Sequence, residues 1–455
     1  MKSLITFINV VVAVCFLSFE PALADEPTVE WEKTIGVRNL EFGLSVQQTS
    51  DDGYIIIGYT RPSGPDGGDS DVYMVKTNDA GILQWQRNFG GIKSDVGCSV
   101  QETFDGGYII AGYTESYGAG YWDVYLIKTD LLGLVDWETT FGTSEYDVAD
   151  VVQQTSDAGY IIAGATRSYG AAGRDVYLIK TDSDGNMIWQ KTLGGSLSES
   201  ANSLQQTTDG GYIIVGYTTS YGAGSSDVYL VKTDANGIMQ WHQTFGASSS
   251  ESGSSVQQTT DGGYVIAGTT SSFGAVNSDV YLIKTDSNGS SQWQKTFGGN
   301  NYDGGSSVRQ TCDGGYIIAG KINDDHGGSC DAYLIKTDFA GNMQWQKTFG
   351  GTYRDWATSV QQTIDGGCIV AGTAGVTRLP EDFDFYLIKI ASEVYLPGDL
   401  DGNRQFDYKD LLILTDNWLE ICYPPCWCRR ADLDKSGLMD FDDFAGFAKR
   451  WFDIE

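Results

Sequence analysis

One tryptophan recurs along most of the chain at a nearly fixed interval, and this periodicity constrains the fold more than any other feature. The first interval is 54 residues and the next five are 52 residues each. The recurring tryptophans are Trp31, Trp85, Trp137, Trp189, Trp241, Trp293 and Trp345. A fixed period of this length predicts a repeat architecture in which each unit is one small supersecondary structure.

Each repeat contains four short segments rich in Val, Ile, Tyr, Thr and Trp, bounded by Gly, Asp or Ser. In the second copy they read SVQET, GYIIAGYT, DVYLIKTD and VDWETTFG. The first two are joined by Asp-Gly, where glycine accepts the positive φ of a tight hairpin. Four antiparallel strands every ~50 residues predict a propeller blade. We therefore expect an all-β fold, a seven-bladed β-propeller over residues 25–395. The alternative, a parallel β-helix, would have shorter coils.

The two ends of the repeat array fit a closed ring. The chain enters the repeats with WEKTIG at residues 31–36, which is a fourth strand, and leaves them with DFYLIK at residues 384–389, which is a third strand. The N-terminal strand is therefore expected to complete the last blade, so that no blade edge stays open. The recurring Trp, the Tyr of GGYII and the paired Ile are expected to form the core between blades.

Acidic residues recur at one end of the repeats, beside long loops such as ESYGAGYW and RSYGAAGR. One set lies ten residues after each tryptophan: Glu41, Asp95, Asp147, Glu199, Glu251, Asp303 and Asp355. A second set begins each D-V-Y segment: Asp71, Asp123, Asp175, Asp227, Asp279, Asp331 and Asp384. A short acid at a strand entrance accepts backbone N–H bonds and fixes the loop. The alternative is a negatively charged rim that collects cations or cationic partners.

Catalytic signals are weak, because acid–base chemistry needs groups whose surroundings differ from those of their copies. His242 follows Trp241 at a strand position usually held by Gln, so we expect it at an outer edge. His326 lies in the divergent loop KINDDHGGSC beside Asp324 and Asp325, where a loop insertion or a metal site are both open. No catalytic residue is assigned.

The N-terminus and the charge indicate an exported protein. Lys2 precedes an apolar run, and Ala22-Leu23-Ala24 is a small-x-small cleavage motif, so residues 1–24 are expected to be a signal peptide cut after Ala24. A membrane anchor, or a lipoprotein at Cys15, are the alternatives. The net charge of -31 argues against nucleic acid and anionic membrane surfaces as partners, and no later segment is apolar enough to span a bilayer.

Export would make the remaining cysteines competent for disulfides. They are Cys98, Cys312, Cys330, Cys368, Cys422, Cys426 and Cys428. Their number is odd, so at least one lacks an intrachain partner. Cys422 with Cys426 or Cys428 could link the two halves of the C-terminal segment, and a zinc site is the alternative there.

The C-terminal residues 396–455 change character and form a separate predicted domain. GDLDGNRQFDYKDLLILTDNWL and ADLDKSGLMDFDDFAGFAKRWF each begin with an acidic loop and run into an amphipathic helix. Calcium takes six to eight oxygens, supplied by loop positions 1, 3, 5, 7, 9 and 12. The first loop offers Asp399, Asp401, Asn403, the Gln405 carbonyl, Asp407 and Asp410; the second offers Asp432, Asp434, Ser436, the Leu438 carbonyl, Asp440 and Asp443. Two Ca²⁺ sites are therefore expected.

This pair of loops over residues 397–452 resembles a type I dockerin, a small calcium-dependent module that docks onto cohesin domains. The aspartate at position 12 of each loop fits that family. Arg404 stands where glycine usually relieves a positive φ, and Tyr408-Lys409 and Phe441-Asp442 stand at the family's usual Ser-Thr recognition pair. The resemblance implies a cohesin-like or other surface protein as partner of the tail.

Together these patterns predict a secreted, non-catalytic recognition or scaffold protein. The repeats resemble secreted bacterial propeller repeats of large surface proteins, and the long-loop rim is where a glycan or protein ligand would bind. One alternative is a polysaccharide-degrading enzyme, a glycoside hydrolase or lyase, which would need non-repeated acids meeting in one pocket. Another is a purely structural surface-layer component.

Overall fold

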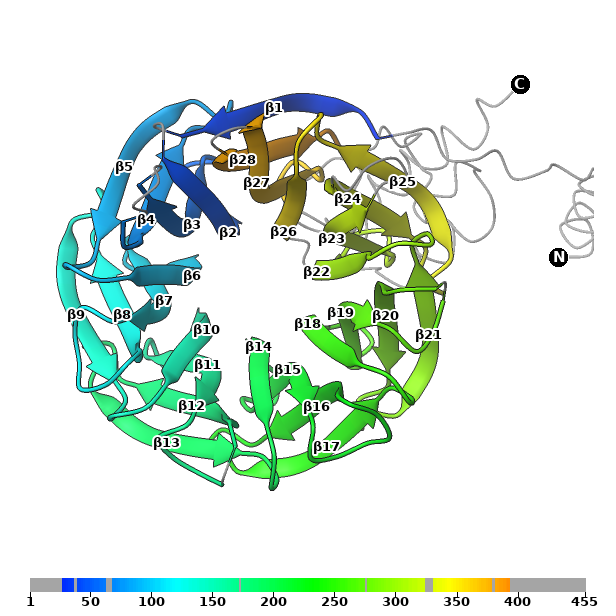
Figure 1. Ribbon diagram of the computed structural model, residues 1–455, viewed down its shortest axis with the longest axis horizontal. Coiled ribbons are helices and arrows are strands. Elements are labelled where there is room, and N and C mark those ends of the chain that lie inside the picture. Colours follow the sequence, from blue (N-terminus) through cyan, green and yellow to red (C-terminus); the bar gives the residue numbers. More distant parts are fainter. Residues whose placement is uncertain are drawn as a thin grey trace, which may run out of the picture.

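The computed structural model describes residues 27–36, 39–62, 68–171, 173–274, 276–323, 330–378 and 381–392. Throughout this part of the chain the regular secondary structure consists of β-strands, in agreement with the predicted all-β class. Figure 1 shows the strands arranged as blades around a central opening, with β2, β6, β10, β14, β18, β22 and β26 innermost. The chain follows the ring once, so that both ends of the repeat array meet.

Five sheets have four strands each, paired in sequence order. The first contains β6 (Asp95–Glu102), β7 (Tyr108–Thr114), β8 (Asp123–Thr129) and β9 (Val135–Phe141). The second contains β10 (Asp147–Gln154), β11 (Tyr160–Thr166), β12 (Asp175–Thr181) and β13 (Met187–Leu193). The third contains β14 (Glu199–Gln206), β15 (Tyr212–Thr218), β16 (Asp227–Thr233) and β17 (Met239–Phe245). The fourth contains β18 (Glu251–Gln258), β19 (Tyr264–Thr270), β20 (Asp279–Thr285) and β21 (Ser291–Phe297). The fifth contains β22 (Gly304–Gln310), β23 (Tyr316–Asn323), β24 (Cys330–Thr337) and β25 (Met343–Phe349).

The remaining strands form one eight-stranded sheet where the two ends of the array meet. Its first half contains β26 (Asp355–Gln362), β27 (Cys368–Arg378), β28 (Glu381–Ile390) and β1 (Val29–Ile35). Its second half contains β2 (Leu40–Gln48), β3 (Tyr54–Arg61), β4 (Asp71–Thr77) and β5 (Leu83–Phe89). β1 pairs antiparallel with β28, as expected from the split repeat, whereas β2 meets β28 through one parallel bridge between Leu40 and Phe383.

The core lies between neighbouring sheets and follows from the two-residue alternation of strands. Ile55 and Ile57 of β3 face the next sheet, where they pack with Tyr108 and Ile110 of β7. Tyr54 faces the opposite way, toward Phe385 and Leu387 of β28 in the other half of the eight-stranded sheet. These side chains are fully buried, which confirms the prediction for the Tyr and Ile positions. The tryptophans pack on the outer border of the same clusters and most stay half-buried; Trp85, for example, meets Tyr108 edge-on with ring centroids 5.9 Å apart.

The short hairpins have the expected Asp-Gly geometry. Gly106, between β6 and β7, has a φ of 83°, which a residue with a Cβ adopts only at a cost. Ala158 has a φ of 66° at the equivalent turn of the next sheet, so this turn carries strain.

Several sequence predictions fall outside the described residues. These are the signal peptide at residues 1–24, the loop residues Asp324, Asp325 and His326, and the C-terminal domain at residues 396–455 with its twelve calcium ligands and its three cysteines. Of the residues that the structure describes, none belongs to a helix long and apolar enough to cross a membrane.

Candidate functional site

The first set of recurring acids lies at the start of the inner strands, where loops are anchored to their carboxylates. Asp147, at the start of β10, accepts hydrogen bonds from the hydroxyls of Thr166 and Ser168 and, at 2.9 Å, from the backbone N–H of Thr143. Glu199, the corresponding acid of β14, accepts from the Thr218 hydroxyl at 2.7 Å. All seven acids of this set are buried: Glu41, Asp95, Asp147, Glu199, Glu251, Asp303 and Asp355. This arrangement fits the structural interpretation of these residues.

The second set of acids holds the long loops. Asp123 Oδ2 accepts from the backbone N–H groups of Ala119 at 2.9 Å and Gly120 at 3.0 Å, so the loop before β8 folds over this carboxylate. Asp123, Asp175, Asp227 and Asp279 are buried, and Asp71, Asp331 and Asp384 are half-buried.

The two sets meet in pairs. At Gly142, whose φ is 154°, a Cβ would collide with both Asp123 Oδ1 and Asp147 Oδ2. Burial raises the pKa of Asp123, its bonds from Gly120 and Ala119 oppose that shift, and the Asp147 charge adds to it. Such a pair could share a proton or a cation, but among the described residues no three His, Cys, Asp or Glu side chains gather as a metal site. Because similar pairs recur between neighbouring sheets, they belong to the scaffold.

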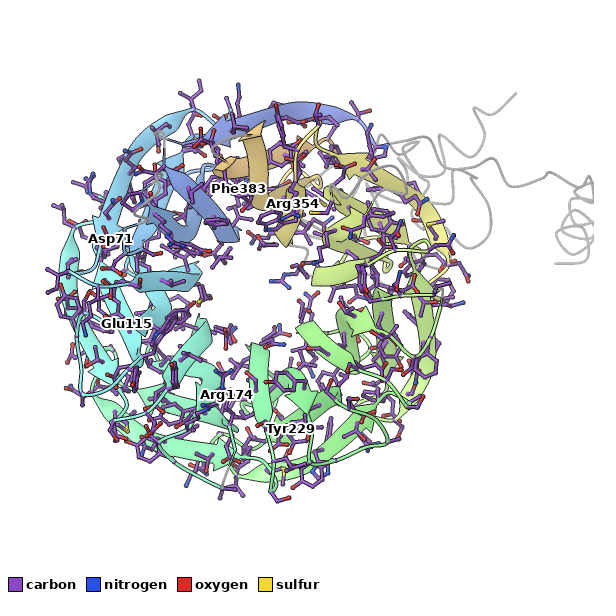
Figure 2. The ribbon with its side chains drawn as sticks, viewed as in Figure 1. Asp71, Glu115, Arg174, Tyr229, Arg354 and Phe383 are labelled. Carbon is purple, nitrogen blue, oxygen red and sulfur yellow. The ribbon has the colours of Figure 1, made fainter. Side chains whose placement is uncertain are left out.

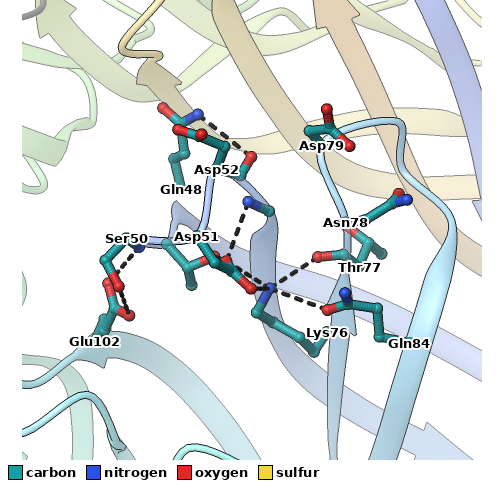
Figure 3. Close-up of polar contacts among 12 residues, drawn as sticks. Gln48, Ser50, Asp51, Asp52, Lys76, Thr77, Asn78, Asp79, Gln84 and Glu102 are labelled. Atoms are coloured by element: carbon teal, nitrogen blue, oxygen red, sulfur yellow. Dashed lines mark hydrogen bonds and ion pairs between the residues drawn. The ribbon is translucent and has the colours of Figure 1, made fainter.

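The opposite end of the sheets carries a recurring ion pair that the sequence reasoning missed. Figure 3 shows its first copy, in which Lys76 Nζ lies 2.9 Å from Asp51 and also donates to the Thr77 carbonyl at 2.9 Å. The side chain of Lys76 is buried, whereas that of Asp51, in the hairpin between β2 and β3, is 56% exposed. The equivalent pairs, here called the lysine latches, are Lys128–Asp105, Lys180–Asp157, Lys232–Asp209, Lys284–Asp261, Lys336–Asp313 and Lys389–Asp365. The signal was present as an invariable Lys in the third strand of each repeat.

His242 lies on β17, the outermost strand of its sheet, as predicted (Figure 1). Its ring stacks on Tyr221 with centroids 4.9 Å apart. In other sheets a glutamine at this position accepts the hydroxyl of the buried tyrosine, as Gln190 does from Tyr177 at 2.6 Å. The Tyr229 hydroxyl next to His242 has no such acceptor. His242 therefore fills a packing position, where its ring contacts Tyr221 of the loop between β15 and β16.

One part of the long-loop rim departs from the repeat by carrying aromatic rings. We call these residues the aromatic arc: Trp356, Phe383, Phe42, Tyr59, Tyr113, Trp122, Tyr121 and Tyr146. Phe42 stacks on Tyr59 with centroids 4.7 Å apart and lies 5.2 Å from Phe383. Further along, the rings of Tyr113 and Trp122 lie 4.0 Å apart.

The arc is confined to a few neighbouring sheets. The positions of Phe42 and Trp356 are occupied by Ser200, Ser252 and Gly304 in the third to fifth four-stranded sheets. Tyr121 stacks on Tyr146 with an interplanar angle of 4° and is 64% exposed, so at least part of the arc faces solvent. The sequence analysis did not predict this surface. Its residues occupy different positions within the repeat, and they come from repeats near both ends of the array.

Polar groups accompany the arc. Asp150 lies at a bulge of β10, where the ladder skips from Ala149 to Val151. Burial raises the pKa of the Asp150 carboxyl to about 7, and the Arg174 guanidinium opposes that shift. Burial, and then the Asp150 charge, raise the pKa of the Cys98 thiol. Figure 2 shows Arg174, Arg354 and Phe383 on the ring. Asp150 is an acid without copies at the equivalent positions of other repeats.

The inner strands enclose a central cavity of about 220 Å³. Its polar lining comprises four serines, Arg309 and the first glutamine of each Gln-Gln or Gln-Glu pair. These glutamines are here called the glutamine ring: Gln47, Gln101, Gln153, Gln205, Gln257 and Gln361. Arg309 stands at the equivalent position of β22 and lines the same cavity.

The strand pairing and the circular arrangement of the sheets define an all-β repeat protein of propeller type, built from four-stranded blades. No family model matches the chain. It is 24% identical over 259 residues to the regulatory protein FlaEY of Caulobacter vibrioides, a stretch that covers 49% of this chain and 26% of that protein.

Among solved structures, the Neurospora crassa Pan2 WD40 domain is similar with a TM-score of 0.46 at 10% identity, covering 79% of this chain and 98% of that one. A fungal alcohol oxidase in complex with copper is similar with a TM-score of 0.48 at 13% identity, covering 82% of this chain and 77% of that one. We take the fold from the strand pairing of this chain itself.

Proposed function

We propose that this chain is a secreted, non-catalytic recognition protein whose long-loop rim binds a glycan and whose C-terminal domain attaches it to a partner. In this proposal the eight-stranded sheet counts as two blades joined at the Leu40–Phe383 bridge, which makes the ring a seven-bladed propeller. The aromatic arc is the observation that carries the proposal, because it breaks the symmetry of the scaffold and lies on the rim that bears the long loops.

A glycan fits the chemistry of the arc. Rings such as Tyr121 and Trp122 can pack against the apolar face of a sugar, while neighbouring charged groups such as Arg174 and Asp150 can hydrogen-bond its hydroxyls. Aromatic residues with adjacent arginine are also the types that dominate binding energy at recognition surfaces. Small side chains at the equivalent positions, such as Ser226 and Ser278, would offer neither contact.

The residues of this surface favour glycan binding over glycan hydrolysis as its function. A polysaccharide-degrading enzyme would use two carboxyl groups with different surroundings. Asp150 is one such acid, and the groups that interact with it electrostatically are Cys98, Tyr113 and Arg174, none of which is a second carboxyl group. We therefore assign Asp150 to ligand contact.

The tail supplies attachment in this proposal. Residues 396–455 would bind two calcium ions through the loops at 399–410 and 432–443 and dock onto a cohesin-like or other surface protein. The signal peptide at residues 1–24 would place the protein outside the cell or at its surface. These parts rest on the sequence patterns and on the dockerin resemblance.

A glycan array probed with the full-length protein tests the recognition surface, with Tyr121→Ala and Trp122→Ala as variants. Both should lose binding by about tenfold or more, since each removes a stacking contact of roughly 1–2 kcal/mol. Phe104→Ala is the matched control, because Phe104 is 74% exposed at the opposite end of the sheets, in the hairpin after β6. Equal binding by all three variants, or hydrolysis of a bound glycan, would refute the proposal.

A further inference from the structure

The side-chain amides of the glutamine ring are oriented so that hydrogen-bond donors face the central cavity. The Oε1 of Gln47 accepts the backbone N–H of Glu102 in the next sheet at 2.6 Å, and that of Gln101 accepts from Gln154 at 2.6 Å. The same bond is made by Gln153, Gln205, Gln257 and Gln361. Because a backbone N–H only donates, the carboxamide atom that faces it must be the oxygen.

The carboxamide NH₂ groups of the ring are therefore turned away from the neighbouring sheet. Among the described contacts, none of these six Nε2 atoms has an acceptor, and none is a buried unsatisfied atom. They lie in the lining of the cavity, where they can donate to a ligand or to water. Donors from several sheets thus converge on one space of about 220 Å³.

Arg309 adds a positive charge to this ring. Its Nη1 donates to the Val308 carbonyl at 2.7 Å and contacts the Ser255 hydroxyl at 3.4 Å. No carboxylate of the described residues forms an ion pair with it. Burial lowers the pKa of the Arg309 guanidinium. A cation in such surroundings is stabilised by a counter-ion.

We propose that the central cavity is an oxyanion-binding site, in which Arg309 and the carboxamide NH₂ groups of the glutamine ring bind a phosphate, a sulfate or a carboxylate. Guanidinium and carboxamide NH₂ groups are donors only, and oxyanions offer several acceptor atoms in a small volume. The site is distinct from the aromatic arc, because none of the residues that line the cavity belongs to the arc.

Isothermal titration of the full-length protein with phosphate, sulfate, acetate and glucuronate, at constant ionic strength, tests the proposal. Saturable binding of about one anion per chain is expected for at least one of them, and the preferred anion distinguishes an inorganic from a carboxylate ligand. No saturable heat with any of the four would overturn the proposal and leave the cavity to water.

Arg309→Gln is the decisive variant. The new carboxamide can take the place of its six counterparts and accept the backbone N–H of Gln362, so the variant should fold. Its anion affinity should fall by about tenfold or more, as expected for the loss of a charged donor. Unchanged affinity would show that Arg309 does not bind the anion.

Two further variants control for nonspecific electrostatics. Gln257→Glu keeps an oxygen acceptor for the Gln310 N–H but brings a negative charge to the cavity, so anion binding should be lost while thermal unfolding stays cooperative. Lys191→Gln removes one positive charge from the exposed face of β13 and should leave the affinity unchanged. An equal loss in Lys191→Gln and Arg309→Gln would mean diffuse attraction and would reject the site.

Discussion

The backbone N–H of Gln48 donates to the Oε1 of Gln361 at 2.6 Å, across 313 positions of sequence. The same contact joins consecutive sheets elsewhere, for example Gln154 N to Gln101 Oε1 at 2.6 Å. The junction between the two chain ends therefore uses the same bond as junctions between sequential repeats. β1 strengthens this junction from outside, where Glu32 accepts a hydrogen bond from the Tyr386 hydroxyl at 2.6 Å.

Removal of β1 should open the ring. Deleting residues 25–37 removes β1, which pairs with β28. The backbone N–H and C=O groups of β28 that bond to β1 would then form an open sheet edge. We expect aggregation, or loss of a single cooperative transition in differential scanning calorimetry. A chain that begins at residue 25 is the control. An unchanged transition in the deleted chain would show that β1 does not close the ring.

Asp147 should contribute to stability through its bonds to the loop. Asp147→Asn replaces one acceptor oxygen by an NH₂ group that faces donors, so the free energy of unfolding should fall by about 1–3 kcal/mol. Urea denaturation measures this change. Glu145→Gln, an exposed carboxylate two residues earlier, should change little. A stable Asp147→Asn protein that has lost a ligand or metal would instead assign the acid to function.

Mutating the aspartate or the lysine of a lysine latch should lower the free energy of unfolding by different amounts. Asp209→Asn leaves the buried Lys232 without its counter-charge, whereas Lys232→Met leaves an aspartate that is 58% exposed and can be hydrated. We expect Asp209→Asn to cost about 1–2 kcal/mol, a value kept small by this exposure, and Lys232→Met to cost less. The double mutant completes a cycle in urea denaturation, and a coupling free energy near zero would contradict the latch.

The latch also predicts a loss of stability in acid. Burial alone would raise the pKa of Asp209, but the Thr207 hydroxyl, Lys232 and the Gly211 N–H lower it to about 2. The folded state thus holds the carboxylate more strongly than the unfolded chain does. This contribution is present above about pH 4 and is lost as the pH falls toward 2. Asp209→Asn should lack that part of the acid transition.

Asp150 should give the opposite pH dependence of stability. Its pKa is about 7 in the folded protein against an ordinary value of 3.8, so the stability associated with its protonated form is full below about pH 4 and is lost as the pH rises through 7. The difference in melting temperature between Asp150→Asn and wild type should grow between pH 4 and 7 and then level off. Glu145→Gln serves as control. A difference independent of pH would show that Asp150 stays ionised throughout.

Calcium titration tests the tail. In the proposed calcium loops, Gly437 stands at the turn position of loop two and Arg404 at that of loop one, where it would add backbone strain and a positive charge near the ion. Calorimetry of the full chain should therefore show two calcium sites of different affinity. Asp432→Ala should remove the tighter site, and Arg404→Gly should reduce the difference in affinity between the two sites. No calcium heat, or loss of the tighter site in Asp399→Ala, would contradict this.

The repeat allowed the strands and much of the scaffold to be predicted. Tyr108 and Ile110 were placed in the core because their spacing recurs and the alternation of a strand fixes their faces. The lysine latches were missed because Lys76 and Asp51 are 25 residues apart, and only their joint recurrence links them. Neither the aromatic arc nor the role of Arg309 follows from any single repeat, since both depend on which repeats become neighbours when the ring closes.

The pairing of β1 with β28 has a consequence for how the protein is made. β1 is synthesised before the repeats and β28 at their end, so β1 has no partner strand while the repeats are being made. Long-range pairing of this kind is slow, and an unpaired strand is prone to wrong association. The repeats offer many near-copies of β28, so β1 could join a wrong third strand first. In that case β1 would have to exchange partners before the ring closes, and the rate of closure should depend on how far β28 differs from its six copies.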